Sequence, residues 1–136
     1  MMGAMARDSH LAKDAMDALD AVWLSGDVPA ILDCFEPELV FFGSGEGEEA
    51  VGHTELEAML EMLAAHAEGG TFRIDWDSLT AERLGDFALV RGVGRVRSSG
   101  SLARFDGTAY RVTGILVHRD GTWRWRVYHG SEPASW

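Results

Sequence analysis

The chain is poor in cysteine and in long apolar runs, which excludes several classes of protein. Its one cysteine, Cys34, allows no intrachain disulfide, fits a reducing cytoplasm and lies in an apolar stretch that indicates core packing. The longest apolar runs have only a few residues, such as 39–42, so no segment predicts a membrane span. The N-terminus lacks an apolar run and carries Asp8, which is untypical of a secretory signal. We therefore expect a cytoplasmic protein.

Positive charge is scarce as well. The chain has 12 Lys and Arg against 22 Asp and Glu, a formal net charge of −10 at pH 7. Nucleic acids and anionic membranes would be repelled, so we expect neither as a partner. Arginine nevertheless gathers in the C-terminal third, at Arg91, Arg95, Arg97, Arg104, Arg111, Arg119, Arg124 and Arg126. These residues form either a basic patch or a solvated sheet face opposite the acidic N-terminal half.

The 136 residues, 46% of them hydrophobic, suit one domain with its own core. We expect this domain over residues 8–133, with residues 1–7 and 134–136 as flexible termini.

The first half of the chain has helical periodicity. One apolar stripe has the 3.6-residue spacing of a helix and comprises Ala12, Ala15, Met16, Leu19, Val22 and Trp23. Asp8 or Ser9 can cap this helix, and Gly26 can end it. Asp27 then caps a shorter helix, which we expect Pro37 to stop.

A third helix is predicted after a short strand at 38–42 and a loop at 43–49. Thr54 and Glu57 form a capping box at its start, and Gly69 and Gly70 close it. The loop contains Glu46, Glu48 and Glu49 between glycines, which indicates either a solvated loop or a catalytic carboxylate pair.

After Gly70 the apolar period changes to two, which is typical of strands. Turn signals at 84–86, 98–101 and 120–121 separate four long strands, ending with 87–98, 103–118 and 122–130. Helices followed by antiparallel strands predict an α+β fold, a half-barrel whose curved antiparallel sheet packs on three N-terminal helices. Gly92 and Gly94 would let a strand bend. The concave side must hold side chains or a ligand.

Several segments together resemble a known family. They are Gly26-Asp27, Leu39-Val40-Phe41-Phe42, Val51-Gly52-His53, Arg111-Val112-Thr113, Asp120-Gly121-Thr122-Trp123 and His129-Gly130-Ser131-Glu132-Pro133. This pattern is similar to the SnoaL-like branch of the nuclear transport factor 2 / ketosteroid isomerase-like superfamily. The resemblance implies a cone-shaped, cystatin-like α+β barrel, a homodimer, and a pocket between sheet and helices. It implies no single function, because members include isomerases, cyclases, dehydratases, transport adaptors and proteins of unknown role.

The last strand supplies the first site candidates. Strict alternation places Trp123, Trp125, Val127 and His129 on one face, with Tyr128 on the other. His129 could be a catalytic acid or base in the pocket, or a structural histidine. Trp123 and Trp125 could line the pocket or pack the core.

Four further residues complete the candidate site. Arg111 could be catalytic, holding a carboxylate or enolate oxygen, or it could pair with Asp75. Trp76 and Phe42 would line the pocket or pack the core, and His53 would lie at its mouth or beside a helix cap. No ligand spacing indicates a metal, and no motif indicates a cofactor.

Two departures from enzyme branches bear on the reaction. Only Glu38 is acidic on the strand where a steroid isomerase has its base, and the first helix has no tyrosine. An Asp-Arg-Asp set like that of the epoxide-hydrolase branch would need Asp75, Asp77 and Arg111 together, which alternation disfavours.

Three functions stay open. The first is a small-molecule-binding domain with an apolar pocket for an apolar or amphipathic molecule. The second is a cofactor-independent acid–base enzyme, an isomerase, cyclase or dehydratase acting on a polyketide-like or steroid-like carbonyl compound. The third is a dimeric association module using the outer sheet face, with Arg124, Arg126 and Tyr128 at the interface.

Overall fold

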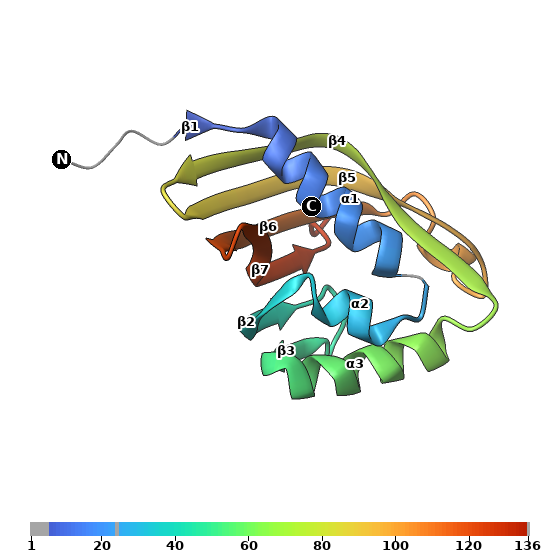
Figure 1. The fold of residues 1–136 in the computed structure, drawn as a ribbon. Helices are drawn as coiled ribbons and strands as arrows, with labels where there is room; N and C mark the ends of the chain where they lie inside the picture. Colours follow the sequence, from blue (N-terminus) through green and yellow to red (C-terminus); the bar gives the residue numbers. More distant parts are fainter. Residues whose placement is uncertain (1–5, 24, 136) are drawn as a thin grey trace.

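The computed structural model describes residues 6–23 and 25–135. The helices are α1 (Ser9–Trp23), α2 (Val28–Leu32), α3 (Gly52–His66) and the 3-10 turn η1 (Ala103–Phe105). The strands are β1 (Ala6–Arg7), β2 (Phe35–Phe42), β3 (Glu49–Val51), β4 (Gly70–Leu84), β5 (Phe87–Gly100), β6 (Ala109–Arg119) and β7 (Thr122–Ser131). In Figure 1 the long strand β4 curves across the molecule and the helices lie on the sheet's concave side.

The strands form one seven-stranded sheet in the order β1-β4-β5-β6-β7-β2-β3. All described neighbours are antiparallel except β2 and β7, which run parallel, so the sheet is mixed. The predicted α+β class and curved sheet on helices are confirmed, whereas a wholly antiparallel sheet is not. Strand β2 begins at Phe35 rather than at residue 38, because α2 ends at Leu32, well before Pro37.

The N-terminal boundary of the domain differs from the prediction. Residues 1–7 were expected outside the domain, yet Ala6 and Arg7 pair with Arg83 and Glu82 of β4. Residues 1–5 and 136 lie outside the described residues.

Side-chain caps start the first two helices as expected. The backbone N–H of Leu11 donates to Asp8 Oδ1 at 3.0 Å, and that of Ala30 donates to Asp27 Oδ1 at 3.2 Å. Each carboxylate satisfies a backbone N–H that has no partner within its helix.

The predicted capping box of α3 is wrong. The helix starts at Gly52, before Thr54, and Glu55 Oε1 accepts the backbone N–H of Val51 at 3.1 Å. Gly52 has φ +82°, a conformation that a residue with a Cβ rarely adopts, and this turn lets the helix begin directly after β3.

Glycine turns join the long strands. Asp120 and Gly121 both have positive φ, 54° and 77°, which confirms the predicted hairpin. Between β5 and β6 the expectation fails, because residues 103–105 form η1 and the strand begins only at Ala109. The turn η1 packs against β5.

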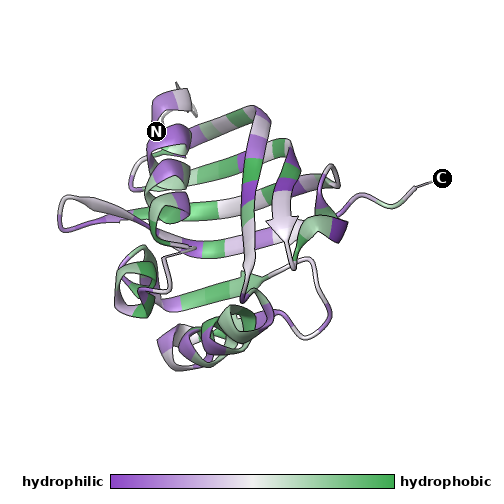
Figure 2. Cartoon of the chain, turned by 90° about the vertical axis from the view of Figure 1, so that its right-hand side faces the viewer, coloured by the Kyte–Doolittle hydropathy of each residue, from purple (hydrophilic) through white to green (hydrophobic). Residues whose placement is uncertain are grey.

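The core lies between the helices and the concave face. Helix α1 packs on β4, and α3 packs on β2 and β3. Apolar and polar residues alternate along the strands (Figure 2), so one face is buried and the other exposed. The largest fully buried side chains include Trp125, Phe35, Met16, Leu39 and Leu56. No helix among the described residues is long and apolar enough to cross a membrane.

Candidate functional site

A cavity of about 550 Å³ opens between the helices and the concave face of the sheet. Its walls come from the end of α1, the end of β2, the loop 43–48, the C-terminal half of α3, the start of β4, the connection 102–105, the start of β6 and the end of β7. A cavity of this size suits a small organic molecule. The helices and the sheet therefore leave a cavity between them, in the place where the sequence predicted a hollow.

Stacked aromatic rings form one wall of the cavity. The rings of Trp23 and Phe41 stack with centroids 5.8 Å apart. Those of Phe41 and Tyr128 stack with centroids 5.0 Å apart and an angle of 4° between the ring planes. Trp125 packs edge to face against the Tyr128 ring, with ring centroids 5.3 Å apart. Such packing fixes the rings in place and presents a flat apolar surface.

Two tyrosines bring their hydroxyl groups together in this wall. The hydroxyl oxygens of Tyr110 and Tyr128 lie 3.4 Å apart, and both residues are buried. Burial is the main reason that both phenols have raised pKa values, with Tyr128 well above its ordinary range. A Cβ on Gly130 would lie only 1.7 Å from the Tyr110 oxygen, so glycine makes room for the pair.

Asp20 is one of the acidic residues that line the cavity. It lies on α1, next to the buried Leu19, and the residue is exposed, while its carboxyl group lies close to packed protein atoms. Desolvation by the surrounding protein, helped by the charge of Asp17, raises the pKa of Asp20 to about 6. The indole N–H of Trp76 opposes the rise, although it makes no hydrogen bond of ordinary geometry. Asp20 can therefore exchange a proton near neutral pH.

The loop 43–48 closes one side of the cavity. The backbone N–H of Gly43 donates to the Glu48 carbonyl at 2.7 Å, and that of Glu48 donates to the Gly45 carbonyl at 3.2 Å. The Glu48 carboxylate also accepts the backbone N–H of Gly45. A Cβ on Gly45 would collide with that carboxylate, so glycine lets the loop fold over Glu48.

His129 lies outside the cavity, so the predicted inward face of β7 is wrong. A bulge at Arg126 shifts the register, because Ile115 pairs with Val127 while Leu116 pairs with Trp125. After the bulge Tyr128 points inward and His129 outward. The imidazole is exposed and meets Phe42 edge to face at 5.6 Å.

Arg111 is also exposed on the outer face, because its neighbours Tyr110 and Val112 point inward. Among the described residues it forms no ion pair, and Asp75 instead pairs with Arg73 and Arg97. No contact among the described residues therefore supports either predicted role of Arg111.

The other sequence candidates divide between core and surface. Phe42 is 41% exposed on the outer face, because β2 turns Phe41 inward instead. His53 Nε2 lies 3.0 Å from the Phe35 carbonyl oxygen and is held there beside the start of α3. Trp123 packs beside His118 with ring centroids 5.0 Å apart, away from the cavity.

Trp76 and Trp125 border the cavity without forming its surface. Trp76 meets the ring of Tyr110 edge to face at 6.1 Å, and Trp125 lies behind Tyr128. Asp20 and the two tyrosines line the cavity and were not among the site residues predicted from the sequence. The available signals were that the chain has only two tyrosines and that Asp20 lies beside the apolar stripe of α1.

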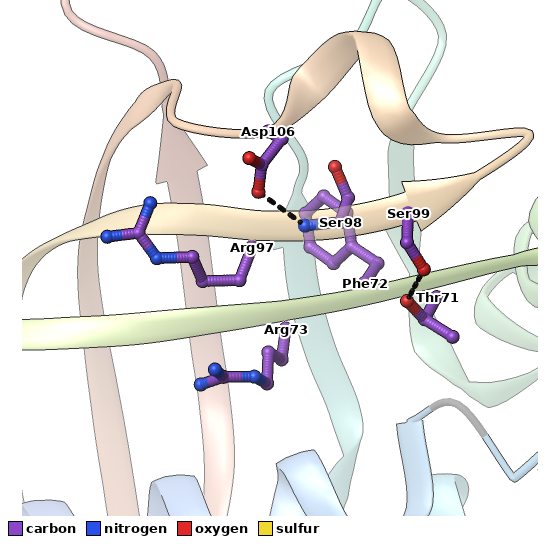
Figure 3. A pocket seen from close by; sticks show the side chains of 7 residues that line it. All are labelled: Thr71, Phe72, Arg73, Arg97, Ser98, Ser99 and Asp106. Atoms are coloured by element: carbon purple, nitrogen blue, oxygen red, sulfur yellow. Dashed lines mark hydrogen bonds between the residues drawn. The ribbon is translucent and has the colours of Figure 1, made fainter.

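A second, shallower groove of about 350 Å³ runs between the start of β4 and the end of β5. Figure 3 shows Arg73 and Arg97 side by side on these strands, and Asp106 accepting the backbone N–H of Ser98, a bond of 3.0 Å. Both arginines bind Asp75, so one carboxylate is shared between the two guanidinium groups. No cluster of three His, Cys, Asp or Glu side chains in the described ranges is placed to hold a metal ion.

Comparison with known proteins places these features in context. A family model described as a SnoaL-like domain matches residues 12–135. No curated protein matches the chain.

Solved structures share the fold at low sequence identity. An NTF2-like protein of unknown function from Pseudomonas putida KT2440 has a TM-score of 0.77 at 19% identity, covering 93% of this chain and 87% of that one. A protein provisionally named a dehydratase of the NTF2-like family, from Streptomyces avermitilis, has a TM-score of 0.77 at 15% identity, covering 94% of this chain and 97% of that one. A protein of unknown function with a cystatin-like fold, from Nostoc punctiforme, has a TM-score of 0.71 at 17% identity, covering 93% of this chain and 92% of that one. These similarities establish the fold alone.

Proposed function

Because the chain belongs to the SnoaL-like domain family, we propose that it binds a small, largely apolar or amphipathic molecule in the cavity between α1, α3 and the sheet. The observation that carries the proposal is a cavity of about 550 Å³ with the ring stack of Trp23, Phe41 and Tyr128 on one wall. A planar ligand would gain apolar contact from these rings, and Asp20 with the tyrosine hydroxyls would orient it.

A cavity-filling variant tests this proposal. Ala67 lines the cavity at the end of α3, whereas Ala64 lies exposed on the same helix. The neutral probe 2-naphthylmethanol should bind the wild type, measured by calorimetry. Ala67→Phe should weaken binding about tenfold or more, and Ala64→Phe should leave it unchanged. Equal binding by both variants would place the molecule elsewhere.

A second candidate function is acid–base catalysis, which the pKa of Asp20, about 6, favours. We propose a dehydration of a hydroxylated polyketide-like or steroid-like carbonyl compound. Protonated Asp20 would give its proton to the leaving hydroxyl, the C–O bond would break and water would depart. The carboxylate would then take a proton from the adjacent carbon, which forms the C=C bond and restores the acid. His129 and Arg111 have no part in this chemistry, because both lie outside the cavity.

The pH dependence tests the catalytic candidate. With such a substrate, turnover should fall as pH rises through about 6, because Asp20 then loses the proton it must give. Asp20→Asn should lower kcat about 100-fold or more, while Asp14→Asn, at an exposed position of α1, should not. Unchanged turnover by Asp20→Asn would remove Asp20 from the reaction.

We propose a homodimer through the outer face of the sheet. The strand register lines up Leu89, Ile115, Val127, Val40 and Val51 in one apolar row across five strands. Leu89 and Val51, at its two ends, are 42% and 60% exposed. Covering this row with a second copy would remove apolar surface from water. Tyr128, which the sequence placed at such an interface, lies inside instead. We also propose a cytoplasmic setting, supported by the single cysteine.

A further inference from the structure

We propose that the cavity selects an organic cation, with a planar apolar body and a protonated amine or quaternary ammonium group. This inference rests on the proposed binding function and adds the charge of the ligand to it. Neutral molecules of the same shape should bind more weakly, and anionic ones more weakly still.

Of the four carboxylates that line the cavity, three on separate elements act electrostatically on the hydroxyl of Tyr110. They are Asp20 on α1, Glu48 in the loop 43–48, and Glu132 after β7, and all three line the cavity. Burial is the largest cause of the raised pKa of Tyr110, and the negative charges of these three carboxylates add to it. Among the described residues, none of the three carboxylates forms an ion pair.

The basic side chains of the lining are engaged elsewhere. Arg73 pairs with Asp75 on its own strand. The guanidinium of Arg104 lies over the ring of Phe105, 4.4 Å from its centroid, and donates to the Ser101 carbonyl at 3.3 Å. These contacts engage both guanidinium groups, whereas the three carboxylates that act on Tyr110 have no cationic partner among the described residues.

The tyrosine pair adds hydrogen-bonding groups to the same cavity. Tyr128 is 7% exposed and Tyr110 is 8% exposed, and both line the cavity. In the part of the chain that the structure describes, the one hydrogen bond of each hydroxyl is the 3.4 Å contact between them. Each phenol oxygen therefore keeps an unused lone pair at the cavity wall, and an ammonium N–H can donate to it.

The aromatic lining suits the same ligand. Trp23, Phe41, Phe72 and Phe105 line the cavity together with the two tyrosines. The faces of such rings are negative and attract cations, most strongly where water is excluded. An anionic group at the Tyr110 end would instead meet three like charges. Carboxylates, phenol oxygens and rings thus favour one ligand charge.

Three probes of the same shape and different charge test the inference. They are 2-naphthylmethylammonium, 2-naphthylmethanol and 2-naphthoate, titrated calorimetrically into the full chain at pH 7.5 and 50 mM salt. We expect the ammonium to bind about tenfold or more tighter than the alcohol, and the carboxylate to bind weakest. Asp20→Asn should weaken ammonium binding about fivefold or more and change alcohol binding less than about twofold.

The net charge of −10 attracts any cation to the surface, so a matched variant is needed. Asp14→Asn removes the same charge from an exposed position of α1 that does not line the cavity. It should leave ammonium binding unchanged, and an equal loss in both variants would overturn the inference. If the alcohol binds as tightly as the ammonium, the cation preference fails while the binding function stands. If no probe binds, both fail.

Discussion

The two faces of the sheet are built from the same strands and carry different chemistry. The concave face presents Phe41, Tyr110 and Tyr128 to the cavity, whereas the outer face presents Arg111 and His129 to solvent. Adjacent residues supply the two sets, because successive side chains of a strand point to opposite faces. A shift of one residue therefore exchanges the contents of the cavity with those of the surface.

The bulge at Arg126 decides which set faces inward on β7. Without it, the alternation that buries Trp125 would bury Val127 and His129 and expose Tyr128. With it, Tyr128 reaches Tyr110 and completes the hydroxyl pair. The residues of β7 that face the cavity therefore depend on a local irregularity of the backbone. Three predictions test how the cavity and the outer face differ.

The largest effect is expected on the concave face, at Gly130. A Cβ there would lie 1.7 Å from the Tyr110 oxygen, so Gly130→Ala must displace the phenol from its partner Tyr128. Overpacking of this kind in a core costs about 2–3 kcal/mol, which urea unfolding would measure. Ligand binding should be lost as well, because the ring forms part of the cavity wall.

Ser131→Ala, one residue further along β7, serves as the control for Gly130→Ala. It trims a half-buried side chain and creates no clash, so it should change stability by less than about 0.5 kcal/mol. If Gly130→Ala unfolds at the same urea concentration as the wild type, the close approach of Tyr110 is not a packing constraint.

The same comparison explains what the sequence could predict. Periodicity and turn residues place the elements, and the helix cap at Asp27 and the hairpin at Asp120-Gly121 are confirmed. These signals are local, so a single sequence contains them. The bulge in β7 arises from pairing with β6, which no window of β7 alone records.

The cavity was predicted from the sequence, but none of the residues predicted to line it, such as His129 and Phe42, is among the residues that do. A polar residue at the edge of an apolar stripe, such as Asp20, belongs to solvent or to a cavity depending on what packs opposite. Trp76, on β4, lies far from Asp20 in the sequence, and only the fold brings its indole toward the carboxyl. Desolvation by the folded protein is the largest cause of the raised pKa of Asp20, and composition does not record it.

A smaller effect on stability is expected at Asp20, with a defined pH dependence. Its pKa is about 6 in the folded protein against an ordinary value of 3.8, so the folded state holds the proton more tightly. Stability therefore falls as pH rises from about 4 to about 6, and above pH 6 the ionised carboxylate keeps the full penalty. Asp20→Asn should stabilise the protein by about 1 kcal/mol at pH 7.5, allowing for partial solvent screening.

At pH 4 the Asp20→Asn variant and the wild type should unfold at nearly the same urea concentration, because Asp20 is then protonated in the folded protein. Asp14→Asn, on the exposed side of α1, should show no such growth of the difference with pH. A constant difference between pH 4 and 7.5 for Asp20→Asn would mean that its carboxyl is not desolvated.

The smallest effect on folding, and the largest on association, is expected on the outer face. Leu89→Glu places a charge at the end of the apolar row that runs through Ile115 and Val127. Because Leu89 is 42% exposed, the monomer should change in stability by less than about 0.5 kcal/mol. Sedimentation equilibrium should show the dimer weakened about tenfold or more, since a charge would be buried in an apolar contact.

Leu84→Glu is the control for this variant. Leu84 is 40% exposed at the end of β4 and lies outside the row, so the change should leave the dimer intact. A wild type that sediments as a monomer at micromolar concentration would instead show that the outer face needs no second copy, and the concave face would then carry the function alone.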